Sequence, residues 1–194
     1  MNNVVNNKKT TRKLTELAML AAVGIVLTSV VPGFPIIPGA GHLLFDFADI
    51  PIAIGAFMYG PISGLIITAI VSLFQALTTA AGDGLYGAVM HFLATGSYVL
   101  VAGLIYKNRK TRKRAAIAMG AGTLTMCIVM IPANMFLTPI YLEQVRGMVP
   151  DLAKTVAFGF ILPAVVPFNL IKAGVNSVLT FFIYKPLRRF ILRD

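Results

Sequence analysis

The chain has 194 residues, of which 57% are apolar and only 12% are charged. Charged residues make up about 25% of an average soluble domain, so this composition excludes an ordinary water-soluble fold and indicates an integral membrane protein. The net charge of +10 comes from Lys and Arg residues beside apolar segments, which is typical of membrane topology and argues against a nucleic-acid-binding face.

Apolar segments long enough to cross a membrane occur at about 14–31, 62–80, 85–106, 115–138 and 163–185. The first follows the basic stretch NNKKTTRK and lacks a small-residue cleavage site, so we expect it to be retained as a helix and not removed as a signal peptide. A chain of this length holds five or six spans with short connections. We therefore predict a single membrane domain covering residues 1–194.

The segment ADIPIAIGAFMY, about residues 48–59, is short for a crossing, because as a helix it reaches only about 18 Å against a hydrocarbon core of about 30 Å. The charges argue that it crosses nevertheless. With six spans, the basic N-terminal segment, the loop KNRKTRKR at 107–114 and the basic C-terminal segment share the cytoplasmic side. We therefore predict an all-α bundle of six transmembrane helices with both termini cytoplasmic, in which 48–59 crosses as a short, tilted or partly unwound helix.

The predicted connections carry turn-forming residues. They are an outer loop rich in Pro and Gly at 31–42, a tight inner turn YGP at 59–61 and an outer turn AAGDG at 80–84. The longest outer connection is 139–162, in which DLAKTVAFGF is expected to form a short helix over the mouth of the bundle. The same topology places Asp46 and Asp49 among the outward-facing acids.

Four spans carry polar residues at helical spacing. In the last span, four polar side chains fall within about 80° of one another at 100° per residue. An unpaired polar group is costly in hydrocarbon, so we expect these stripes to face protein or a cavity. The alternative for the small and hydroxyl residues is helix packing. The stripes are Asn169, Lys172, Asn176 and Thr180; Gly64, Thr68, Ser72, Gln75 and Thr79; His91, Thr95, Tyr98 and Ala102; and, more weakly, Thr123, Cys127, Met130, Asn134 and Thr138.

Six residues of these stripes are predicted to bind a substrate, and all but Asn176 lie in the outer half of the membrane, where they could line one outward-facing pocket. A buried lysine costs several kcal/mol by insertion scales unless it snorkels to a near interface, so Lys172 is the strongest candidate. The rival interpretation of His91 is a neutral histidine packed in the core. The predicted residues are Gln75, His91, Asn134, Asn169, Lys172 and Asn176.

Enzyme chemistry is not predicted. The chain contains no GxxxxGK[ST], no HExxH and no nucleophile paired with a base at a recognisable spacing. His42 lies in a loop and forms no cluster with His91 at metal-ligand spacing, so no metal site is predicted. The single cysteine, Cys127, is expected to be a buried packing residue.

A small-molecule pocket without an ATP site needs an energising partner. Ala18 and Ala22 are spaced i, i+4 in the first span, a small-xxx-small pair that lets another helix approach closely. The alternative from a different functional class is a self-contained channel or secondary carrier. The basic loop at 107–114 could meet a cytoplasmic partner or anionic lipid, although its role as a topology determinant explains it as well.

Together these features resemble the S components of energy-coupling factor (ECF) vitamin transporters, in the branch that contains riboflavin- and pantothenate-type members. The resemblance covers almost the whole chain. It is carried by the Ala18 and Ala22 pair and by the blocks FDFADIPIAIGAFMYGPISGLI (45–66), TLTMCIVMIPAN (123–134) and VPFNLIKAGVNSV (166–178).

The resemblance implies a six-helix subunit of a bacterial cell membrane that binds a vitamin from outside. It would join a T component and two cytoplasmic ATPases, topple to release the vitamin inward, and hold no cofactor of its own, since the ATPases use the ATP. Ala18 and Ala22 would contact the T component. The pocket would be built from the last three helices and outer loops, with 36–47 as a cap, which points to His91, Asn134, Asn169 and Lys172.

The resemblance also bears on the vitamin. Riboflavin-type members carry a Glu-x-x-Lys-Asn pattern in the third helix, where this chain has Thr68, Val71 and Ser72. Pantothenate is an anion, and Lys172 could pair with its carboxylate by a charge-assisted hydrogen bond. Pantothenate is therefore the favoured vitamin, and riboflavin, a hydroxymethylpyrimidine and a pyridoxine-like vitamin are the alternatives.

Overall fold

The computed structural model describes residues 2–31, 33–40, 43–78 and 84–191 and is almost entirely helical. Five helical segments are long and apolar enough to span a membrane, which confirms the predicted all-α membrane class. The helices are α1 (Asn2–Val30), α2 (Asp49–Tyr59), α3 (Pro61–Thr78), α4 (Gly84–Lys107), α5 (Arg112–Gln144), α6 (Pro150–Phe160), the π-helix η1 (Ile161–Val165) and α7 (Val166–Ile191). Two short antiparallel strands, β1 (Phe34–Pro35) and β2 (Leu44–Phe45), lie between α1 and α2.

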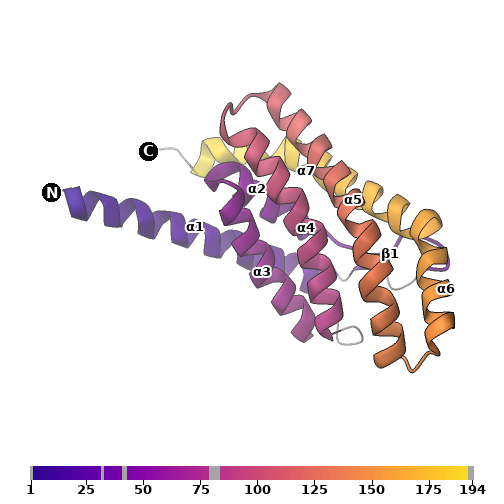
Figure 1. Cartoon of the computed structure of the whole chain (residues 1–194). Helices are drawn as coiled ribbons and strands as arrows, with labels where there is room; N and C mark the ends of the chain where they lie inside the picture. The colour runs from indigo at the N-terminus through magenta and orange to yellow at the C-terminus, as the bar shows by residue number, and fades with distance from the viewer. Residues whose placement is uncertain (1, 32, 41–42, 79–83, 192–194) are drawn as a thin grey trace.

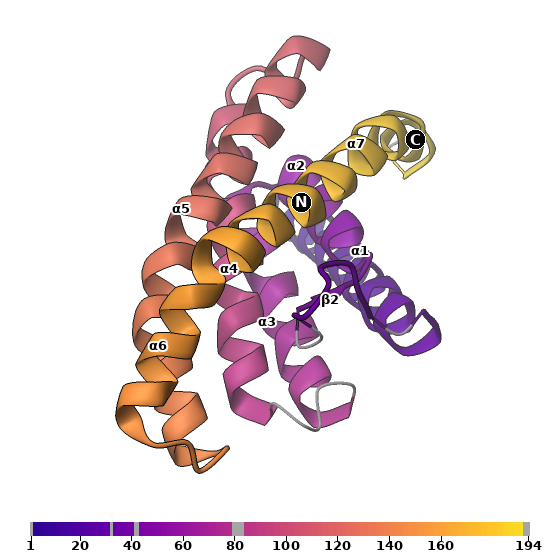
Figure 2. The same ribbon diagram turned by 90° about the vertical axis from the view of Figure 1, so that its right-hand side faces the viewer.

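The helices form one bundle, in which α4 packs against both α3 and α5, and α7 packs against α2 and α5. The first part of α1 projects away from this bundle (Figure 1). Both ends of the chain and the connection between α4 and α5 lie toward one end of the molecule, and the connection between α5 and α6 lies at the other (Figure 1). In the perpendicular view, α6 leads directly into α7, and α7 crosses the bundle (Figure 2).

Helix α2 is the short segment that the sequence placed at 48–59, and it is a regular helix of 11 residues. At 1.5 Å per residue it reaches about 16 Å, and all of its residues except Tyr59 are buried. One end of α2 is held by an aromatic cluster, in which Phe57 stacks on Tyr106 at 4.4 Å and meets Tyr184 edge-on at 5.5 Å. Helix α2 is thus enclosed by its neighbours, which explains why it is apolar on all sides after Asp49.

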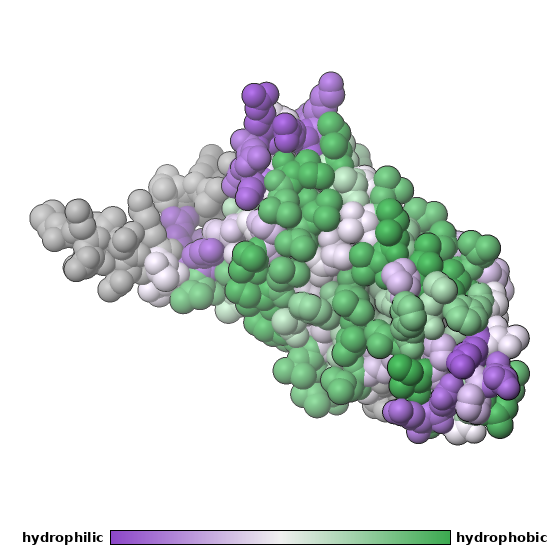
Figure 3. Space-filling view, in the orientation of Figure 1, coloured by the Kyte–Doolittle hydropathy of each residue, from purple (hydrophilic) through white to green (hydrophobic). Residues whose placement is uncertain are grey.

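The polar stripes face the interior, as predicted. Thr68, Thr95 and Thr180 are fully buried, whereas Leu77 and Phe182 on the opposite faces of their helices are at least 70% exposed. This reverses the pattern of a water-soluble helix, because the surrounding solvent is lipid. The exposed apolar side chains form a hydrophobic band between hydrophilic ends (Figure 3).

The region 139–162 contains the predicted short helix, because DLAKTVAFGF forms α6 (Pro150–Phe160), but less of the region is loop than expected. Helix α5 continues to Gln144, and α6 runs through η1 into α7, so the last helical segment begins at Pro150. Prolines do not end these helices. Pro132 and Pro139 lie inside α5, and Pro163 lies in η1, where the wider π turn accommodates a residue without an amide hydrogen.

The packing of α3 on α4 depends on a close backbone approach at Gly103. A Cβ atom there would lie 2.9 Å from the Pro61 Cα and 3.1 Å from the Pro61 nitrogen. We expect Gly103→Ala to lower the thermal unfolding midpoint, with a cost of about 1–3 kcal/mol, because a backbone cannot move aside as a flexible side chain can. In the matched control Gly120→Ala, the added Cβ meets nothing within 4 Å, so the midpoint should stay the same or rise. Equal midpoints in both variants would contradict the close approach.

Candidate functional site

A cavity of about 590 Å³ lies in the half of the bundle away from the chain termini, between α4, α5, α6, α7 and the segment before α2. Its volume is in the range of small-molecule sites. Five of the six predicted substrate-binding residues line it, namely Gln75, His91, Asn134, Asn169 and Lys172. Asn176 is buried one turn further along α7 and is not among the residues lining the cavity.

One side of the cavity is aromatic. Tyr86 of α4 and Tyr141 of α5 stack with ring centroids 4.2 Å apart and an interplanar angle of 15°. The guanidinium of Arg146 lies 5.6 Å from the centroid of the Tyr141 ring. Phe160 and Phe168 add further aromatic surface. Such a wall suits a flat, conjugated ligand, because aromatic rings gain from stacked contacts.

Two asparagines, Asn134 of α5 and Asn169 of α7, supply neutral polar groups to the cavity wall. Asn134 Nδ2 donates to the Met130 carbonyl at 2.8 Å, and Asn169 Nδ2 donates to the Val165 carbonyl at 2.8 Å. Each amide is therefore held by its own helix. The Asn134 Oδ1 accepts from Thr138 Oγ1 at 3.0 Å, while no group in the described part of the chain donates to Asn169 Oδ1. The two amide carbonyls are positioned to accept hydrogen bonds from a ligand.

Lys172 does not stand alone in the cavity wall. Its Nζ donates to Asp46 Oδ2 at 2.8 Å and lies 3.9 Å from Asp49 Oδ2. Asn176 Nδ2 donates to the Asp46 carbonyl at 3.1 Å and to Asp49 Oδ2 at 3.2 Å. Lys172, Asp46 and Asp49 are each less than 10% exposed. Pairing explains how these charges are tolerated inside a membrane protein, because an isolated buried charge costs far more than a paired one.

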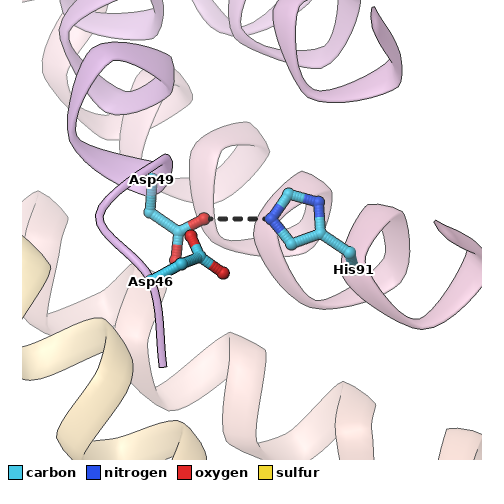
Figure 4. A group of neighbouring side chains, drawn as sticks. All are labelled: Asp46, Asp49 and His91. Carbon is cyan, nitrogen blue, oxygen red and sulfur yellow. Dashed lines mark ion pairs between the residues drawn. The ribbon is translucent and has the colours of Figure 1, made fainter. Parts of the chain in front are cut away.

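His91 extends this network toward α3. Its Nε2 lies 3.4 Å from Asp49 Oδ1, and Figure 4 shows the ring turned toward that carboxylate. Its Nδ1 lies 2.7 Å from Ser72 Oγ. Thr95 Oγ1 also donates to Asp49 Oδ1 at 2.7 Å. His91 is therefore both part of the cavity wall and one of the groups that hold Asp49.

The sequence prediction missed Asp46 and Asp49 by assigning them to the outward-facing acids. Both are buried, and they join the segment before α2 to α7. The sequence did contain a signal for this pairing. The two acids of the block FDFAD lie at the start of an apolar helix, and the last span holds one intramembrane lysine. An intramembrane lysine calls for a carboxylate partner.

Asp46, Asp49 and His91 offer ligand atoms that all lie within 4.8 Å of one another (Figure 4). Two carboxylates and an imidazole could hold a divalent cation. However, the Lys172 ammonium lies 2.8 Å and 3.9 Å from these same carboxylates. The lysine thus already lies beside these carboxylates and balances one of their two negative charges.

The expected cap, residues 36–47, is represented in the cavity wall by Leu43, Leu44 and Asp46. His42 lies outside the described residues. Asp46 fixes this segment in two ways, because its Oδ1 accepts from the Ala48 amide at 2.9 Å while its Oδ2 binds Lys172. The end of the cap is therefore anchored to α7 by an ion pair.

Ala18 and Ala22 lie away from the cavity, on an exposed face of α1. The same helix exposes large apolar side chains, including Met19, Val23 and Val26. The structure therefore leaves the two alanines accessible from the membrane, while the intervening Ala21 is buried in the bundle.

The family model described as the substrate-specific component of ECF transporters matches residues 12–184. The riboflavin transporter RibU of Staphylococcus aureus (strain TCH60) is 32% identical over 191 residues, which cover 96% of each chain. The riboflavin transporter FmnP of Bacillus subtilis (strain 168) is 28% identical, covering 93% of this chain and 94% of that protein. The folate transporter FolT of Leuconostoc mesenteroides is 28% identical, covering 91% and 86%.

A solved structure, described as that of the S component of a bacterial ECF transporter, has a similar fold. Its TM-score is 0.72 at 29% identity, and the match covers 95% of this chain and 99% of the other. The similarity therefore extends over the whole bundle, including the elements that surround the cavity.

Proposed function

The chain belongs to the substrate-specific components of ECF transporters, and on that premise we propose that it captures riboflavin in the cavity between α4 and α7. As a member of this family it is a substrate-binding subunit and an integral membrane protein. The relatives from S. aureus and B. subtilis, which cover more than nine tenths of the chain, are both named riboflavin transporters. These names support the riboflavin alternative better than the pantothenate favoured from the sequence.

The observation that carries the proposal is the ion pair between Lys172 and Asp46. Pantothenate was favoured because a free lysine would bind its carboxylate, but the lysine charge is already balanced by a carboxylate at 2.8 Å. An anionic ligand would have to displace Asp46 or leave it buried without a partner, which is costly. A neutral isoalloxazine ring, flat and edged with carbonyl and N–H groups, suits the stacked tyrosines and the amides of Asn134 and Asn169.

The departure from the riboflavin-type pattern in the third helix does not weigh against this proposal. Thr68, Val71 and Ser72 are buried, and none of them is among the described residues that line the cavity. Thr68 instead bonds the Gly64 carbonyl within α3 at 2.8 Å, and Ser72 contacts His91. In this chain these positions therefore serve packing and support.

Transport is proposed to need a T component and two ATPase subunits, with Ala18 and Ala22 in the interface and ATP used by the partners. The chain has no phosphate-cradling GxxxxGK[ST] of its own, and no resident cofactor is proposed. Both termini are proposed to face the cytoplasm, because they lie toward the same end as the basic loop after α4 (Figure 1). A hydrophilic cluster marks that end of the molecule (Figure 3).

Riboflavin binding is tested directly by titrating the detergent-purified protein with riboflavin and following flavin fluorescence. We expect the protein to quench the flavin fluorescence in a saturable way. Adding pantothenate as a competitor should not reduce this quenching. Mass spectrometry of small molecules released by denaturation should find the same vitamin. Displacement of riboflavin by equimolar pantothenate, or co-purification with folate, would overturn the assignment.

Asn134→Leu should weaken riboflavin binding by at least about tenfold, or about 1.4 kcal/mol. The change removes the amide carbonyl that lies in the cavity wall and its hydrogen bond from Thr138. The matched control is Asn108→Leu, because Asn108 is exposed in the turn after α4 and remote from the cavity. Equal affinities in both variants would remove Asn134 from the binding site.

A further inference from the structure

We propose that a second cavity, at the end of the bundle that carries the chain termini, binds the phosphate headgroup of an anionic membrane lipid. This cavity has a volume of about 500 Å³ and lies between the start of α5 and the last turns of α7. Figure 2 shows α5 and α7 diverging toward this end of the molecule. The inference does not depend on which vitamin the first cavity binds.

The lining of this cavity is cationic on one side. Lys110, Arg112 and Lys185 contribute to it, and none of the described residues that line it is acidic. In the sequence on either side of the cavity, no Asp or Glu occurs from residue 84 to 142 or from 152 to 193, and Asp194 lies outside the described residues. A phosphate suits such a site, since Arg and Lys bind it by charge-assisted hydrogen bonds.

The other side of the cavity is apolar. Phe181, Phe182 and Met119 line it, and Phe182 is 70% exposed on the outer surface of α7. In a protein that spans a membrane this surface contacts lipid, so an acyl chain can lie against the phenylalanines while its headgroup reaches the basic side. A soluble phosphate ester would use only half of this lining, which is why we assign the site to a lipid.

The deep end of this cavity belongs to the packed core. Tyr106 and Tyr184 line it, and their rings meet edge-on with centroids 5.7 Å apart. Lys110 also donates to the Met58 carbonyl at the end of α2, at 3.3 Å. A lipid in this cavity would therefore contact the residues that join α2, α4 and α7, and it should stabilise the bundle as well as bind to it.

Native mass spectrometry tests the site with phosphatidylglycerol and with phosphatidylcholine of the same acyl chains. We expect the wild type to bind phosphatidylglycerol at least about tenfold more tightly. The triple variant Lys110→Gln, Arg112→Gln and Lys185→Gln should lose this preference. The matched control removes the same charge from the same end at residues outside the cavity, with Lys107→Gln, Arg109→Gln and Lys113→Gln, and should retain it.

Loss of the preference in both triple variants would show diffuse attraction to basic residues and overturn the site, as would its retention in both. Displacement of phosphatidylglycerol by an equal concentration of glycerol phosphate would overturn the lipid assignment in favour of a soluble phosphate ester. Should a triple variant fail to fold, the neighbouring single changes Arg112→Gln and Lys113→Gln make the same comparison. Thermal unfolding in detergent serves as the folding control, because it does not depend on either ligand.

Discussion

Lys172→Met is expected to destabilise the protein by about 3–5 kcal/mol, because it leaves Asp46 and Asp49 buried without their cation. It should also weaken riboflavin binding by about 100-fold, since the same lysine lines the cavity and anchors its cap. Thermal unfolding in detergent and flavin titration measure the two effects. Unchanged values in both would mean that the ion pair contributes neither to stability nor to binding.

A second variant separates the two roles of Lys172. In the double change Lys172→Met with Asp46→Asn, the lysine and the carboxylate 2.8 Å from it are removed together, so part of the lost stability should return, while Asp49 keeps its hydrogen bonds from Thr95 and Asn176. Affinity distinguishes the roles. If Lys172→Met weakens binding only because it leaves Asp46 buried and unpaired, binding recovers together with stability, whereas if the lysine itself is needed, to anchor the cap or to touch the vitamin, binding stays weak in a stable protein. A double variant no more stable than Lys172→Met would contradict the pairing itself.

Ala18→Trp with Ala22→Trp is expected to abolish assembly with the energising partners and therefore ATP-driven riboflavin uptake. Both alanines are exposed on α1, so the large rings meet no neighbour within the chain but prevent another helix from approaching closely. Co-purification of partner subunits and uptake into vesicles measure the loss. Riboflavin binding by the isolated subunit should be unchanged, because these residues do not line the cavity.

The control for this interface is Leu124→Trp, which places the same indole ring at an exposed position of α5. The Leu124→Trp variant should bind riboflavin and take it up as the wild type does. Loss of binding in the alanine variant would show that Ala18 and Ala22 pack inside the chain, and normal uptake would exclude this face of α1 as the partner surface.

The sequence correctly predicted which helix faces are buried, because lipid leaves polar side chains only the inward direction. A polar side chain in hydrocarbon must turn inward, so spacing along a single helix was enough to place Asn134, Asn169 and Lys172 on buried faces. The same rule brought Gln75 and His91 to the cavity. This rule does not distinguish residues that line a cavity from residues in a buried hydrogen-bond network. Asn176 lies on the same stripe as Lys172, but it donates hydrogen bonds to Asp46 and Asp49.

By itself, therefore, the sequence determined the membrane class, the helical spans and the inward direction of the polar stripes, because these depend on composition and on periodicity within one helix. Only the tertiary structure decided that Asp46, 126 residues away from Lys172 along the chain, neutralises that lysine. It also decided that α6 continues through η1 into α7. Hydropathy and spacing do not report on the distance between separate segments, and the preference between an anionic and a neutral vitamin depended on that distance.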